Sequence, residues 1–133
     1  MVKSRTIREG ANPTSDQLAI RGLPSGGDVD AADVRRSAAL NCELYGFHGI
    51  SVWVPNADYP VEWLQRTKLA KFDRYAEYLV GDLKAYGMGL RATGQSPHYD
   101  VVSETDDLDD LVRQFMSTPH RVGFNPRADR DDV

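Results

Sequence analysis

The chain has 133 residues, of which 41% are hydrophobic and 27% are charged, and this composition predicts one soluble domain with a core that needs no disulfide. The formal net charge of −4 excludes a broad nucleic-acid surface, so a nucleic acid is expected only as a locally bound substrate. No apolar run approaches the roughly 20 residues of a membrane span, and the single cysteine, Cys42, favours a cytoplasmic location.

The apolar pattern along the chain predicts five short strands and two to three helices. In chain order we expect strands at 18–23, 49–54, 75–80, 88–93 and 99–102, helices at 30–45 and 61–71, a helical turn at 82–87, and a last helix that Ser103 or Thr105 begins and Pro119 ends. Asp30 can cap the first helix and Gly46 can end it. We expect a turn at 24–27 after the first strand, and a turn at 94–97 that joins the last two strands as a hairpin. This order favours an α+β fold, a small mixed or mostly antiparallel sheet of about five strands with the helices packed on one face.

Both ends of the chain are expected to lie outside the folded domain. Residues 1–16 are interpreted as a flexible arm, 17–126 as the single domain and 127–133 as a frayed tail. Residues 101–133 contain eight acidic and four basic side chains, so the excess negative charge is concentrated there. Such a segment suits contact with a basic protein partner. The sequence makes no prediction of oligomeric state.

Three histidines each begin a short apolar run, and histidine is the side chain that titrates nearest neutrality. The spacings between His48, His98 and His120, 50 and 22 residues, match no local metal motif, so zinc is the weaker cofactor candidate. Histidines can also cleave RNA as base and acid without a metal. We favour His48, because it lies three residues before Ser51 in the strand expected at the centre of the sheet. His98 and His120 are interpreted as structural.

Other conspicuous side chains receive structural interpretations. Trp53 and Trp63 are expected to anchor the core, and Cys42 is expected on the buried face of its helix. A basic cluster is interpreted as a solvated face, although a local basic site stays open; it consists of Arg66, Lys68, Lys71 and Arg74.

Two short pieces separated by the first helix, Ile20-Arg21-Gly22 and Gly49-Ile50-Ser51-Val52-Trp53, resemble small bacterial proteins of the ADP-ribosyltransferase fold. The resemblance implies that Arg21 holds the phosphates of NAD and that Ser51 shapes the nicotinamide pocket. It further implies that Tyr75 or Tyr78 stacks on the nicotinamide ring, and that Glu104 stabilises the oxocarbenium-like sugar.

The sequence therefore supports two classes of function. The first is a small effector enzyme of toxin type that acts on NAD, by ADP-ribosyl transfer, or on RNA. Its predicted catalytic residues are His48, Ser51 and Glu104, and its predicted cofactor-binding residues are Arg21, Tyr75 and Tyr78. The second is a non-catalytic partner-binding module, such as an antitoxin, immunity or adaptor protein. Convergence of Arg21, His48 and Ser51 on one concave pocket would favour the enzyme, and their scatter over the surface would count against it.

Overall fold

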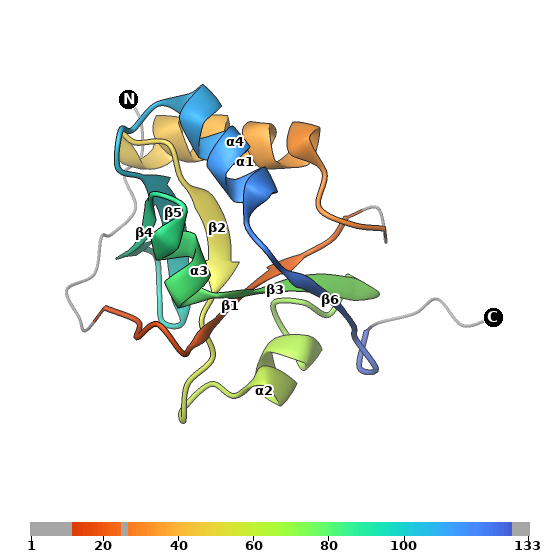
Figure 1. Cartoon of the computed structure of the whole chain (residues 1–133). Coiled ribbons are helices and arrows are strands. Elements are labelled where there is room, and N and C mark those ends of the chain that lie inside the picture. Colours follow the sequence, from red (N-terminus) through yellow and green to blue (C-terminus); the bar gives the residue numbers. More distant parts are fainter. Residues whose placement is uncertain (1–11, 25–26, 129–133) are drawn as a thin grey trace.

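The computed structural model describes residues 12–24 and 27–128, in which six strands form one antiparallel sheet and four helices pack on it (Figure 1). The strands are β1 (Leu18–Gly22), β2 (Ile50–Trp53), β3 (Arg74–Leu79), β4 (Met88–Ala92), β5 (His98–Ser103) and β6 (Arg121–Phe124). The helices are α1 (Ala31–Tyr45), α2 (Val61–Arg66), α3 (Val80–Ala85) and α4 (Leu108–Ser117). The α+β class and the antiparallel sheet expected from the sequence are thus confirmed.

The sheet, in the order β4-β5-β2-β1-β3-β6, is divided at its centre. Its other neighbouring strands align over four or five residues, but β1 and β2 align only at Ile20 and Trp53. Beyond that pair the two strands diverge, so that β2, β4 and β5 cross the direction of β1, β3 and β6 (Figure 1). The fold therefore has two three-stranded halves that share a narrow junction.

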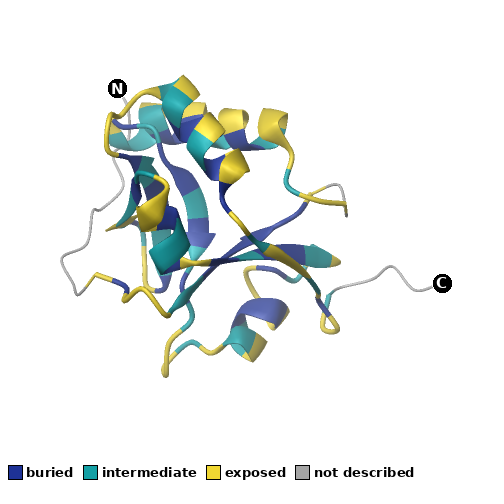
Figure 2. Cartoon of the chain, in the orientation of Figure 1, coloured by how far each residue is buried: buried dark blue, intermediate teal, exposed yellow. Residues whose placement is uncertain are grey.

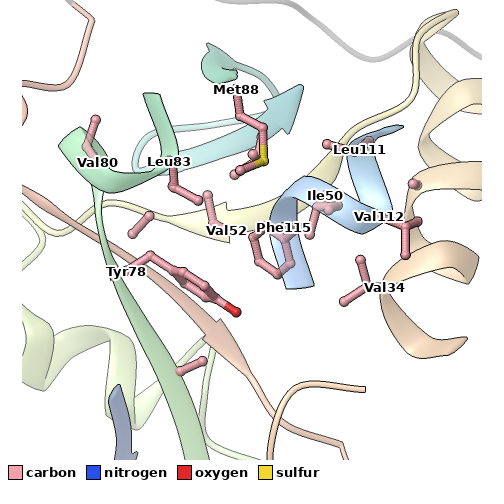
Figure 3. Packing of buried hydrophobic residues seen from close by; sticks show 14 of the residues in the cluster. Val34, Ile50, Val52, Tyr78, Val80, Leu83, Met88, Leu111, Val112 and Phe115 are labelled. Carbon is pink, nitrogen blue, oxygen red and sulfur yellow. The ribbon is translucent and has the colours of Figure 1, made fainter. Parts of the chain in front are cut away.

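The main core lies between the sheet and three of the helices. Figure 3 shows Val34 of α1, Leu83 of α3 and Phe115 of α4 converging on Ile50 and Val52 of β2. All of these side chains are fully buried, and β2 alternates between buried and intermediate residues, dark blue and teal in Figure 2. Burial of such large apolar side chains is the main stabilising contribution, about 2 kcal/mol for each one.

A second, smaller core lies on the opposite face of the sheet. There Leu64 of α2 and Leu69 pack on Ile20 of β1 and Tyr75 of β3. The expectation that all helices cover one face is therefore wrong.

The second helix is shorter than the predicted helix at 61–71. These residues carry apolar side chains at too few helical positions to bury a long helix, and α2 ends at Arg66. The chain then continues through a turn that buries Leu69.

Two further features differ from what the sequence predicted. The last helix begins after Asp107, whose carboxylate accepts a hydrogen bond from the amide of Asp110, and not at Ser103 or Thr105. The edge strand β6 was not expected, because it has only four residues and most of them are exposed.

The N-terminal end of the described region is held against the fold. Pro13 accepts a hydrogen bond from Lys84, and Ser15 accepts one from the amide of Gly81, so this part of the expected arm packs against α3. Residues 1–11 of the arm, 129–133 of the tail and 25–26 of the first predicted turn lie outside the described residues.

Candidate functional site

The junction between the two half-sheets is bridged by the side chain of Arg21. The amide of Val54 donates to Pro97 on the β5 side of β2, so by strand alternation the carbonyl oxygen of Ser51 faces β1. Arg21 Nη1 donates to that oxygen at 2.9 Å, and Nη2 donates to Asp33 of α1 at 2.9 Å. The side chains of Arg21 and Asp33 are only 11% and 19% exposed, so this ion pair is shielded from water. Arg21 thus joins β1, β2 and α1.

A second polar group lies against the same strand and is centred on Asp100 of β5. Asp100 is fully buried and faces Ser51 across the β2–β5 pair. Its Oδ1 accepts from Asn41 Nδ2 at 2.9 Å and from Ser51 Oγ at 3.3 Å, and its Oδ2 accepts from Thr93 Oγ1 at 3.0 Å. Gly49 leaves room for this arrangement, since a Cβ there would lie 2.8 Å from the Asp100 Cβ. Three donors thus offset the cost of burying the carboxylate.

Thr93 connects Asp100 to His98. Thr93 Oγ1 lies 3.0 Å from His98 Nδ1, and the carbonyl oxygen of Thr93 lies 3.2 Å from the same nitrogen. Because the hydroxyl hydrogen of Thr93 is donated to Asp100, both Thr93 oxygens act as acceptors toward His98. We therefore assign the ring hydrogen of neutral His98 to Nδ1 and its lone pair to Nε2.

His98 and Ser51 line a cavity of about 550 Å³ on the face of the sheet that carries α2. Trp53, Tyr59 and Trp63 supply its aromatic walls, and the ring of Trp53 meets that of His98 edge-on with centroids 5.3 Å apart. The remaining lining residues are Lys68, Gly94, Gln95 and Ser96. The cavity thus combines aromatic rings, on which a planar ring can stack, with several hydrogen-bonding groups.

One cation lines this cavity. Of the described residues that form its lining, Lys68 is the charged one, and none of them is Asp or Glu. Arg66, at the end of α2, and Lys71, in the turn that follows, are also exposed. None of these three cations forms an ion pair with another of the described residues. Of the basic cluster identified in the sequence, Lys68 therefore lines the cavity, where it would attract an anion, whereas Arg74 begins β3 and packs over the Phe124 ring.

The predicted NAD-binding residues do not line this cavity. Arg21 is engaged by Ser51 and Asp33, as described above. Tyr75 is buried in the smaller core, where its hydroxyl accepts from Gln65 Nε2 at 3.0 Å. Tyr78 is fully buried in the main core against Phe115, and burial raises the pKa of its hydroxyl. The proposed roles of these residues toward NAD stay predictions.

The predicted catalytic residues are distributed over separate places. Ser51 lines the cavity beside His98. His48 lies at the start of α4 instead, with its Nδ1 3.3 Å from the carbonyl oxygen of Asp106. Glu104 is exposed and lines a different hollow, of about 420 Å³, together with Tyr45 and Arg91. Arg21, His48 and Ser51 therefore do not share one pocket.

The three histidines do not gather either. His98 lies in the cavity, whereas His120 Nε2 lies 2.7 Å from Asp28 Oδ1, and this hydrogen bond lowers the pKa of the Asp28 carboxyl. Within residues 12–24 and 27–128, no three His, Cys, Asp or Glu side chains are placed to hold a metal ion.

None of the described helices is long and apolar enough to cross a membrane.

The acidic C-terminal quarter is exposed around the start of α4, with Glu104, Asp106, Asp107 and Asp109 at the surface. A protein partner for this region stays a prediction.

Comparison with known proteins adds no assignment, since no protein-family model, curated protein or solved structure matches this chain.

Most of the residues that line the cavity were not predicted from the sequence as functional residues. His98 was interpreted as a structural residue of a hairpin and both tryptophans as core anchors, whereas Trp53 and Trp63 pack on the smaller core and also line the cavity. One signal was available: His98 and Asp100 are two apart in the chain and share a face of a strand, and Thr93 ends the predicted strand on the other side of the hairpin turn.

Proposed function

We propose that the cavity binds a nucleotide of single-stranded RNA and that the protein acts on RNA. The observation that carries the proposal is the lining itself: three aromatic side chains and one histidine, with a lysine as the charged group. Proteins hold unpaired bases by stacking them on aromatic rings, and each stacked base contributes about 1–3 kcal/mol. Lys68, with Arg66 and Lys71 nearby, supplies positive charge for the phosphates that flank the base.

RNA suits this surface better than NAD, the other ligand class expected from the sequence. NAD carries two phosphates on a short linker, whereas RNA continues past the cavity as a chain of phosphates. Lys68 lines the cavity, and Arg66 and Lys71, two and three residues away in the sequence, are exposed and offer further positive charge to a continuing backbone. This local basic surface is also compatible with the net charge of −4, because it occupies only the α2 side of the molecule.

Intrinsic fluorescence gives a direct test, because the two tryptophans of the chain, Trp53 and Trp63, both line the cavity. We expect a short oligoribonucleotide whose 2′-hydroxyls are methylated, so that it stays intact, to quench the emission saturably. Binding should weaken with salt, by a slope of about 0.7 for each phosphate contacted. Quenching by NAD without quenching by the oligonucleotide would overturn the proposal and favour the NAD alternative.

A matched pair of charge reversals localises the binding. Lys68→Glu should weaken binding strongly, since it places a carboxylate in the cavity. Arg113→Glu changes the net charge by the same amount on α4, a helix that packs on the opposite face of the sheet. Equal loss of affinity in the two variants would show that binding depends on net charge and not on this cavity.

A further inference from the structure

We propose that the cavity also cleaves the RNA that it binds, with His98 as the general base that takes the proton of a ribose 2′-hydroxyl. This inference rests on the proposed RNA binding and adds a reaction to it. It starts from the position of His98, which is both a lining residue of the cavity and the end of a buried hydrogen-bond chain.

The orientation of the His98 ring suits a base. Nδ1 faces Thr93, where the hydroxyl and the carbonyl oxygen both accept, so Nδ1 carries the hydrogen of the neutral ring. The lone pair is then on Nε2, at the edge of the ring that is turned away from Thr93. Trp53 meets the ring edge-on, as a wall of the same cavity. A base stacked on these aromatic side chains would lie in the same cavity as His98.

The reaction needs no further reactant than RNA and water. Nε2 of His98 accepts the proton of the 2′-hydroxyl as the 2′-oxygen forms a bond to the adjacent phosphorus. The bond from phosphorus to the 5′-oxygen of the next nucleotide breaks, and that oxygen takes a proton from water. The products are a 2′,3′-cyclic phosphate and a 5′-hydroxyl end, and His98 returns its proton to solvent. Lys68, as the cation of the cavity, would stabilise the additional negative charge on the phosphoryl oxygens.

Thr93 and Asp100 act as positioning residues in this scheme. Thr93 gives its hydroxyl hydrogen to Asp100 at 3.0 Å and is therefore an acceptor toward His98. When His98 takes up a proton, the positive ring is linked through Thr93 to a buried carboxylate, which stabilises the charge that develops in the transition state. The hydrogen bonds from Asn41 and Ser51 hold the Asp100 carboxylate in place.

The cleavage test uses the full-length protein and a DNA oligonucleotide that contains a single ribonucleotide, so that one bond can be cut. We expect cleavage on the 3′ side of that ribonucleotide, a cyclic phosphate end, and no cleavage when its 2′-hydroxyl is methylated. His98→Ala should lower the rate about 100-fold or more while the methylated oligonucleotide still binds. The matched control is His120→Ala, which removes a histidine outside the cavity and should leave the rate unchanged.

The tautomer is tested separately from any substrate. In protein labelled with ¹⁵N at histidine, the ring nitrogens of neutral His98, identified by their absence in His98→Ala, should show the hydrogen on Nδ1. Thr93→Val keeps the shape of the side chain but removes its hydroxyl, and it should alter the His98 ring signals and slow cleavage while RNA affinity is kept. A hydrogen on Nε2 in the unmodified protein would overturn the inference.

The outcomes separate the two proposals. Failure to bind the methylated oligonucleotide overturns the proposed function and the cleavage inference together. Binding without cleavage, or cleavage that survives in His98→Ala, overturns the inference and leaves RNA binding intact. Loss of cleavage in His48→Ala but not in His98→Ala would also overturn it, in favour of the residue expected from the sequence.

Discussion

Replacing Arg21 by methionine tests whether this residue holds the two half-sheets together. Methionine keeps an apolar stem of similar length but removes the guanidinium, so the carbonyl oxygen of Ser51 and the carboxylate of Asp33 each lose a hydrogen bond of 2.9 Å. The backbone pairing between β1 and β2 is limited to Ile20 and Trp53, so no neighbouring ladder compensates for the loss. We expect a marked loss of stability with an unchanged fold.

The size of the effect follows from burial. Hydrogen bonds that involve a charged group contribute about 1.5–3 kcal/mol, and removing one partner of a buried ion pair costs about 3–5 kcal/mol. Asp33 keeps 19% of its side-chain surface exposed and has Arg36 at 3.7 Å, which reduces the penalty of leaving it without Arg21. We therefore expect Arg21→Met to lower the free energy of unfolding by about 3 kcal/mol, near the lower end of that range. For a domain of this size the melting temperature would fall by about 10 °C.

Urea denaturation of Arg21→Met, Asp33→Ala and the double variant measures this coupling directly. If the ion pair stabilises the junction, the double variant should be more stable than the sum of the single effects predicts, by about 1 kcal/mol or more. A coupling below about 0.5 kcal/mol would refute the argument, since unrelated positions differ from additivity by that much. The alternative role of Arg21, as a ligand of the NAD phosphates, predicts unchanged stability of the variant and loss of any stabilisation by NAD.

Two further predictions concern single contacts. Gly22→Ala should destabilise the protein by about 1–3 kcal/mol, because the added methyl group would overlap the Phe72 ring, whereas Gly27→Ala, with nothing within 4 Å of the added carbon, should change the melting temperature little. Asp28→Asn should lower stability near neutral pH by less than about 1 kcal/mol, because the Asp28 carboxyl is exposed to solvent. The hydrogen bond from His120 lowers the pKa of Asp28 below its ordinary value of 3.8, so the effect should be complete above that value and vanish as the pH falls through the lowered pKa. Melting curves of both proteins at pH 3 and pH 6 check this, and a difference that grows toward pH 3 would contradict it.

The parts of the fold that could be predicted are those that depend on the local pattern of residues along the chain. Helix α1 was expected because Asp30 and Gly46 are its two ends, and both cap it in the structure, Asp30 by accepting from the amide of Ala32. The β4–β5 hairpin was expected because turn residues separate two apolar runs. The strand β6 has no such signal, since its pairing with β3 depends on residues about 45 positions away in the chain.

The candidate site was harder to predict because its residues meet only through pairings between distant segments. Asp100 and Ser51 are 49 positions apart and meet because β2 pairs with β5, and Asn41 reaches them from a helix. No spacing in the sequence encodes these contacts. The sequence could place His98 in a hairpin, but its position in an aromatic cavity depends on where α2 packs, and α2 was expected on the other face.

Ser51 connects the stability of the fold to the proposed chemistry. Its carbonyl oxygen is held by Arg21 from the other half-sheet, and its hydroxyl is held by Asn41 and Asp100. The same carboxylate, through Thr93, orients His98 in the cavity wall. These hydrogen bonds form a continuous chain from Arg21 to His98. Loss of the Arg21 side chain would therefore loosen β2, the strand on which Ser51 and Trp53 line the cavity. Under the proposed function, Arg21 would therefore influence RNA binding without touching RNA, and that influence would appear as a loss of affinity that scales with the loss of stability.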